Sequence, residues 1–141
     1  MPDFLDLHGR TSKQVRALTE ARLQRHGLHL GQDRLLAELW ERDGRTPGEI
    51  ATAAGVTTPA VVKMAGRMVE AGWIAKRGDE RDSRLVRLWL TDAGRALREP
   101  VEAERRWVDE QITADLTAGE RRDLIAALAK VHAAARALAA G

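Results

Sequence analysis

The sequence predicts a mainly α-helical protomer with one small β-structure near its middle. The chain has 141 residues, enough for one hydrophobic core. It is rich in Ala and Leu, which favour helices, and aromatic residues make up only 4% of it. Residues 85–90 alternate between two faces with the period of a half-buried strand. We therefore expect several helices and a single small sheet.

Two helices are predicted in the first third of the chain. The first is capped by Thr11 or Ser12 and ends near Gly27. The second begins at Gly31 and is broken by the Asp43-Gly44 turn. The apolar face of this second helix consists of Leu35, Leu36, Leu39 and Trp40.

The centre of the chain predicts two more helices joined by a tight turn. Thr46-Pro47-Gly48-Glu49 is a capping box with Pro at the first helical position, and it opens a short helix over 47–54. Gly55 turns the chain, and Thr57-Thr58-Pro59 opens a helix that runs to about Ala71. The face of this helix predicted to be buried consists of Val61, Met64, Ala65 and Met68.

Two strands and two helices complete the predicted order. A strand over 73–76 and a strand over 85–90 flank a charged loop. Thr91 caps a long helix that ends near Thr113, and Pro100 should bend it. The segment 117–120 is a second capping box. It opens a last helix with a near-heptad apolar seam of Leu124, Leu128, Val131, Ala135 and Leu138.

This order of elements is that of a winged helix-turn-helix domain. A helix about 10–12 Å across fits a major groove about 12 Å wide. The loop between the strands can reach the minor groove, where Arg is favoured. We expect residues 30–98 to form the DNA-binding lobe, flanked by helical segments over 1–29 and 99–141.

The distribution of charge also indicates a polyanionic partner. Residues 57–98 carry nine basic and five acidic side chains, whereas 1–56 carry eight of each and 99–141 carry six basic and eight acidic ones. A local excess of positive charge is typical of a nucleic-acid-binding surface.

The sequence contains no pattern typical of a metal site, an enzyme active site, a secretory signal or a membrane span. The chain has no Cys, and its four His residues form no pair at i, i+4, so no metal site or cofactor is predicted. It has no phosphate-binding Gly-rich loop, nucleophile elbow or His-Glu-x-x-His motif, so we do not expect an enzyme. No secretory signal or apolar run of about 20 residues is present, which predicts a cytoplasmic protein.

Five short motifs carry a resemblance to a known family. They are Gly48-Glu49-Ile50-Ala51, Gly55-Val56-Thr57, Glu70-Ala71-Gly72-Trp73-Ile74, the segment 79–84, and Leu90-Thr91-Asp92-Ala93-Gly94. Together they resemble the MarR (multiple antibiotic resistance regulator) family of bacterial transcription factors, and the flanking helices match in order and length. The resemblance implies a homodimeric regulator, expected to be a repressor, on a pseudo-palindromic operator. It also implies that 1–29 with 99–141 form a helical dimerisation lobe.

The resemblance assigns a role to the charged loop. In this family an Asp-x-Arg at the wing places its Arg in the minor groove, and Asp82 and Arg84 occupy those positions with Thr91 in register. Asp82 can also hold the Arg84 guanidinium by a charge-assisted hydrogen bond. Ser83 departs from the family, where another Arg is common, and Arg81 could substitute for it. The alternative is an exposed ion pair of little energetic value. The candidate wing residues are Arg77, Arg81, Asp82 and Arg84.

The outer face of the 58–71 helix supplies the other candidate DNA contacts. Thr and Val can contact a thymine methyl group, Lys63 can reach guanine or phosphate, and Arg67 can bind phosphate. The alternative is that the two cations only keep this face soluble. The candidate residues are Thr57, Thr58, Ala60, Val62, Lys63 and Arg67.

Two readings of the terminal helices and of the partner stay open. The seam over 124–138 can be intermolecular, as the family resemblance implies, or it can close an intramolecular bundle. A winged-helix adaptor that binds protein instead of specific DNA is an alternative function, and a metal-responsive regulator is another.

The resemblance also implies an effector site. Similar proteins bind small aromatic or phenolic anions in a crevice between the dimer helices and the winged domain. The alternatives are that the two Trp residues belong to the core and that the His residues are solvated. The candidate pocket residues are Arg16, His26, His29, Trp40 and Trp107.

Overall fold

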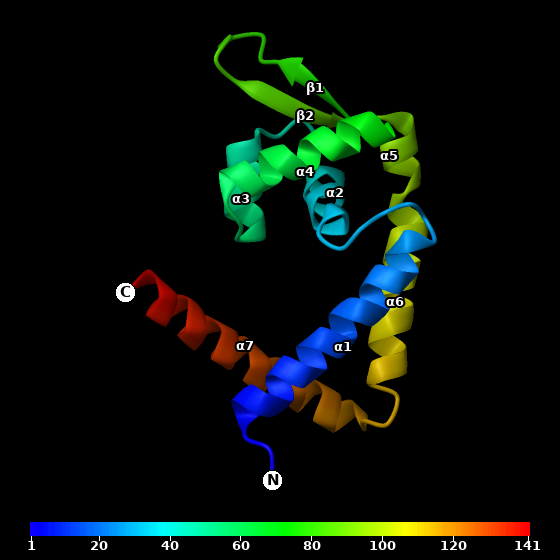
Figure 1. Cartoon of the computed structure of the whole chain (residues 1–141), viewed down its shortest axis with the longest axis vertical. Helices are drawn as coiled ribbons and strands as arrows, with labels where there is room; N and C mark the ends of the chain where they lie inside the picture. Colours follow the sequence, from blue (N-terminus) through cyan, green and yellow to red (C-terminus); the bar gives the residue numbers. More distant parts are fainter. The chain divides into compact units, whose positions relative to one another are not determined.

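The computed structural model describes residues 1–141 and confirms a mainly helical fold with one two-stranded sheet (Figure 1). The chain divides into two compact units, Met1–Arg106 and Trp107–Gly141. The elements are α1 (Phe4–Gln24), α2 (Gln32–Glu41), α3 (Pro47–Ala54), α4 (Thr58–Ala71), β1 (Ile74–Gly78), β2 (Val86–Leu90), α5 (Asp92–Ala96), α6 (Arg98–Ile112) and α7 (Ala118–Ala140).

Local capping signals fix the helix-turn-helix formed by α3 and α4. The Thr46 hydroxyl accepts a hydrogen bond from the Glu49 amide at 3.2 Å, and the Glu49 carboxylate accepts one from the Thr46 amide at 3.3 Å. Thr57 caps α4 through its side chain. Gly55 and Gly72 end α3 and α4 in the left-handed conformation. The predicted boundaries of both helices are thus confirmed.

The wing is an antiparallel hairpin of β1 and β2. Its register runs from Ile74 opposite Leu90 to Gly78 opposite Val86. The Arg45 carbonyl accepts a hydrogen bond from a β2 amide at 2.9 Å, so the segment before α3 joins the edge of the hairpin. The first strand begins one residue later than predicted and extends to residue 78.

The core of the first unit lies beneath α4 and the hairpin. Val61, Ala65 and Met68 are buried, and Met64 packs against them, as the periodicity of α4 predicted. Fully burying a large apolar side chain contributes roughly 1.5–3 kcal/mol of transfer free energy. The same cluster includes Leu23, Leu28, Leu35, Leu36, Leu39, Ile50, Leu88, Leu97 and Val101.

The predicted start of the first helix, at Thr11 or Ser12, is wrong. The helix begins at Phe4, because the Asp3 carboxylate accepts a hydrogen bond from the Asp6 amide at 2.8 Å and caps the helix there. The Thr and Ser hydroxyls are therefore not needed as caps.

The long helix predicted after the wing is divided at Leu97 into α5 and α6. Leu97, between α5 and α6, keeps right-handed helical backbone angles, and Pro100 lies in the first turn of α6. A proline in a first turn costs no hydrogen bond, because the amides there have no partner within the helix. The division falls in the turn before Pro100, which is the turn that a proline is expected to disturb, because it has no amide hydrogen to donate to the carbonyl four residues earlier.

The second unit contains the end of α6 and all of α7. Thr117 and Glu120 form the predicted capping box, with reciprocal hydrogen bonds of 3.1 and 3.0 Å. No residue of α7 is buried. No helix of the chain is both long and apolar enough to cross a membrane. The large apolar side chains exposed along α7 are Leu124, Ile125, Leu128, Val131 and Leu138.

Candidate nucleic-acid interface

One face of α4 is exposed and the opposite face is buried in the core of the first unit. Val61 and Ala65 turn into the core, while Lys63 and Arg67 project from the opposite face and form no side-chain hydrogen bond or ion pair. All six predicted residues of this face are exposed, and they are Thr57, Thr58, Ala60, Val62, Lys63 and Arg67.

The wing loop, residues 79–85, is organised by Asp79. Its Oδ2 accepts hydrogen bonds from the amides of Arg81 at 2.9 Å and Asp82 at 2.8 Å. The Asp79 amide donates to the Leu85 carbonyl at 3.0 Å, which closes the loop. The loop therefore has a defined shape rather than an open, solvated one.

Asp82 holds Arg84 in the way that the sequence predicted. The Arg84 Nε and Nη2 atoms each donate to one Asp82 carboxylate oxygen at 3.0 Å, and the Arg84 amide donates to Oδ1 at 3.0 Å. The hydrogen bonds from Arg84 lower the pKa of the Asp82 carboxyl, and the same pairing raises the pKa of Arg84. The Arg84 side chain stays 87% exposed. An exposed pair adds little stability, so its effect is to orient the guanidinium.

The other two cations predicted as wing contacts differ in their surroundings. The Arg77 guanidinium lies over the Trp89 ring, 5.9 Å from its centroid, in a cation–π contact. The Arg81 side chain is exposed and forms no hydrogen bond or ion pair. Arg81 is therefore free to meet a polyanion, while Arg77 is held beside the hairpin.

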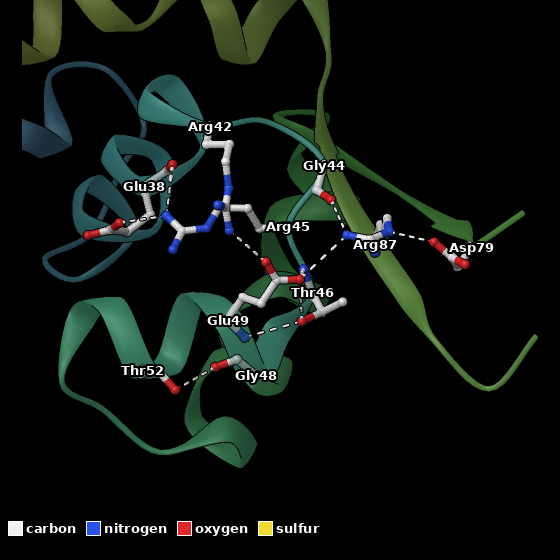
Figure 2. Close-up of polar contacts among 10 residues, drawn as sticks. All are labelled: Glu38, Arg42, Gly44, Arg45, Thr46, Gly48, Glu49, Thr52, Asp79 and Arg87. Carbon is white, nitrogen blue, oxygen red and sulfur yellow. Dashed lines mark hydrogen bonds and ion pairs between the residues drawn. The ribbon is translucent and has the colours of Figure 1, made fainter. Parts of the chain in front are cut away.

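Arg87 is a site residue that the sequence reasoning missed. Its Nε donates to Asp79 Oδ1 at 2.6 Å, and its Nη1 donates to the Gly44 carbonyl at 3.0 Å and to Glu49 Oε1 at 3.4 Å (Figure 2). The sequence marked Arg87 only as the polar side of a strand. Its partners Gly44 and Glu49 lie 43 and 38 positions away, so no local pattern points to them.

The base of the wing is fixed against the segment before α3. Gly44 has φ of 72°, and a Cβ at this position would overlap the Trp89 indole, so only glycine fits. The Asp43 carboxylate accepts a hydrogen bond from the Leu90 amide at 2.9 Å. These contacts attach the base of the hairpin to the segment before α3.

Thr91, in the Leu90–Gly94 motif that follows the wing, contacts both α4 and α5. Its Oγ lies 2.6 Å from the Gly72 carbonyl oxygen and 3.0 Å from that of Trp73, and it accepts the Gly94 amide at 3.1 Å. The residue that caps α5 therefore also binds the end of α4. This contact ties α4 to the start of the helical segment beyond the wing.

The predicted effector residues lie in separate environments. The Trp40 Nε1 donates to the Gly94 carbonyl at 3.0 Å, and Trp40 lines a cavity of about 340 Å³. His29 lies 2.8 Å from a Glu20 oxygen, and His26 lies 3.9 Å from one of Glu104. The other four predicted effector residues do not line this cavity, and they are Arg16, His26, His29 and Trp107. The effector pocket therefore stays a prediction. No group of three or more His, Asp or Glu residues is placed to hold a metal ion.

Sequence comparison relates this chain to known regulators. The MarR family model matches residues 26–85. The chain is 30% identical over 122 residues to the HTH-type transcriptional repressors Mb2911 of Mycobacterium bovis and Rv2887 of Mycobacterium tuberculosis. Each alignment covers 86% of this chain and 88% of the relative.

Solved structures show the same fold. A mutant MarR from E. coli, complexed with operator DNA, is 25% identical, with a TM-score of 0.81 and coverage of 89% of this chain and 90% of that one. The S. aureus MepR–DNA complex is 21% identical, with a TM-score of 0.87 and coverage of 95% and 99%. Its likeness concerns the fold alone. From the sequence relatives and the shared winged-helix fold, we conclude that the chain belongs to the MarR family, whose members are transcription regulators and not enzymes.

Proposed function

We propose that this protein is a sequence-specific DNA-binding repressor that acts as a homodimer on a pseudo-palindromic operator. The observation that carries the proposal is a set of exposed cations, Lys63 and Arg67 on α4 and Arg84 on the wing, within one winged-helix unit. The relatives named as repressors and the operator complex of the 25% identical E. coli MarR mutant support it.

The recognition helix α4 enters the major groove in this proposal. Lys63 contacts guanine acceptors or phosphate, Arg67 contacts phosphate, and Val62 and the Thr side chains at its start contact thymine methyl groups. No Asn or Gln lies on this face to read adenine, so DNA shape contributes to the discrimination.

The wing enters the flanking minor groove. Arg84 is the principal contact, because Asp82 presents it at the tip of an ordered loop. Arg81 is free to add a second positive charge, and Arg77 lies at the side of the hairpin. A narrow minor groove attracts such side chains through its enhanced negative potential.

Dimerisation supplies the second half of the interface. Two recognition helices about 34 Å apart meet successive turns of the major groove. We propose that residues 30–98 bind DNA and that 1–29 with 99–141 form the dimer, because the exposed apolar side chains of α1 and α7 need a partner. Such a regulator acts in the cytoplasm, where bacterial DNA lies.

Control by a small aromatic or anionic effector is the last part of the proposal, and it rests on the family resemblance. Titrating benzoate into the operator complex tests it: release of DNA by wild type and its loss in Arg16→Ala would support the predicted pocket. Release that is equal in both proteins would exclude Arg16 from the site.

The DNA-binding proposal is tested by selecting bound fragments from the sheared genome and measuring their affinity by fluorescence anisotropy. A duplex carrying the selected sequence should bind about a thousandfold or more tightly than a scrambled duplex near 0.15 M salt. Equal binding of both duplexes would contradict a sequence-specific regulator.

A further inference from the structure

The Arg87 side chain connects the wing to the helix-turn-helix. One of its nitrogens reaches Asp79 at the root of the wing loop, and another reaches Gly44 and Glu49 before and within α3. Figure 2 shows the guanidinium between these groups, on β2. The side chain is 31% exposed, so it lies along the protein surface instead of projecting from it.

Two carboxylates flank this one guanidinium. The hydrogen bonds from Arg87 and from two loop amides lower the pKa of Asp79 to about 2, and the pairing raises the pKa of Arg87. Glu49 also caps α3 through Thr46 and accepts a hydrogen bond from Arg42 at 2.7 Å. The Arg87 guanidinium therefore donates its hydrogen bonds to acceptors within the protein, whereas Lys63 and Arg67 have no such partners.

A continuous series of contacts leads from Arg87 to the tip of the wing. Asp79 Oδ1 accepts from Arg87, while its Oδ2 accepts from the amides of Arg81 and Asp82. The Asp82 carboxylate then holds Arg84. The position of the exposed Arg84 thus depends on where Asp79 is fixed.

We propose that Arg87 is a positioning residue for DNA binding, which holds the wing loop at a set place relative to α3 so that Arg84 and α4 meet the two grooves together. This inference rests on the proposed function. It differs from a direct contact, in which Arg87 itself would bind phosphate.

Replacing Asp79 distinguishes positioning from a purely electrostatic effect, because the two predict opposite changes in operator affinity. Asp79→Asn removes a negative charge, and electrostatics alone would strengthen DNA binding. An amide has one acceptor oxygen where the carboxylate has two, so it cannot accept from Arg87 and from the loop amides together. Positioning therefore predicts operator binding weaker by roughly tenfold.

Glu80→Gln is the matched control, because it makes the same charge change in the same loop, and Glu80 forms no side-chain hydrogen bond or ion pair.

A double-mutant cycle tests whether Arg87 acts through Arg84. Arg87→Ala should weaken operator binding by roughly tenfold in the wild-type background and by less than about twofold in the Arg84→Ala background. Equal losses in the two backgrounds would show that Arg87 acts independently, and would overturn the proposal.

Hydrogen exchange of the DNA-free dimer gives a readout that does not depend on any operator. The amides of Arg81 and Asp82 should exchange faster in Arg87→Ala and Asp79→Asn than in wild type or Glu80→Gln. Unchanged exchange would overturn the contact series, and faster exchange with unchanged operator affinity would overturn the positioning role. Wild type that binds no sequence specifically would instead refute the proposed function, whatever the exchange shows.

Discussion

At the scale of single residues, the two wing aspartates perform different tasks. Asp79 uses one oxygen for the Arg87 side chain and the other for two loop amides, so it shapes the loop. Asp82 uses both oxygens for Arg84 and so aims one cation outward. The Arg84 partner of Asp82 is exposed, and such an ion pair adds little stability, so the main effect of Asp82 is on geometry.

The lowered pKa of Asp79 predicts how the wing responds to acid. Its pKa is about 2 in the folded protein, against an ordinary value of 3.8. Its ionised contacts are therefore fully favourable above pH 3.8 and are lost only as the pH falls through about 2. We expect the carboxyl carbon of Asp79 to titrate near pH 2 by NMR, and to shift toward the ordinary value of 3.8 in Arg87→Ala. A wild-type midpoint at that ordinary value would contradict the contacts.

The cations of α4 make a separate prediction about salt. If Lys63 and Arg67 neutralise phosphates, each change to Gln should reduce the slope of log K against log salt by about 1. Arg34→Gln is the matched control, since Arg34 is exposed, unpaired and lies on α2 of the same unit. A slope that is unchanged by both α4 substitutions would remove these residues from the interface.

At the scale of elements, α4, the hairpin and α5 meet at one crowded junction. Thr91 binds the end of α4 and caps α5. A Cβ at Gly94 would overlap the Trp73 carbonyl oxygen, so the start of α5 can lie this close only because residue 94 is glycine. The close approach accounts for the Gly in this motif.

Two glycine substitutions should therefore change stability in opposite directions. Gly94→Ala should destabilise the protein by roughly 1–3 kcal/mol, because a backbone atom must move. Gly66→Ala lies within α4 with no atom near its Cβ, and it should stabilise by about 0.5–1 kcal/mol through helix propensity. Urea unfolding at one fixed protein concentration measures both. A neutral Gly94→Ala would contradict the packing at this junction.

The elements also show which features a sequence can predict. Both capping boxes and the buried face of α4 were predicted correctly, because their signals lie within about two helical turns of each other. The start of α1 was missed because Asp3 caps the helix, and it lies eight residues before Thr11, the first of the two caps that were predicted. Arg87 was missed because its partners are brought together only by the fold.

At the scale of the whole molecule, the proposed dimer rests on the exposed apolar side chains of α7. No residue of this helix is buried, although Leu124, Leu128 and Val131 recur at helical spacing. Single exposed apolar residues are ordinary, but a row of them on one helix marks an interaction surface. A dimer would also place two recognition helices on one duplex.

Sedimentation velocity tests this dimer directly. Wild type should sediment as a dimer at micromolar concentration, and Leu128→Glu should shift it toward monomer, because a charge would be buried without a partner. A monomeric wild type at that concentration would support the intramolecular bundle and refute the dimer.

The most direct test of the account is the affinity of the operator for wild type, Arg84→Ala and Arg34→Ala, measured by fluorescence anisotropy near 0.15 M salt. Both variants lose one exposed positive charge from the same unit, but only Arg84 lies on the wing. We expect Arg84→Ala to weaken specific binding by roughly 1–3 kcal/mol and Arg34→Ala to have little effect. Equal affinities of wild type and Arg84→Ala would contradict a wing that binds the minor groove.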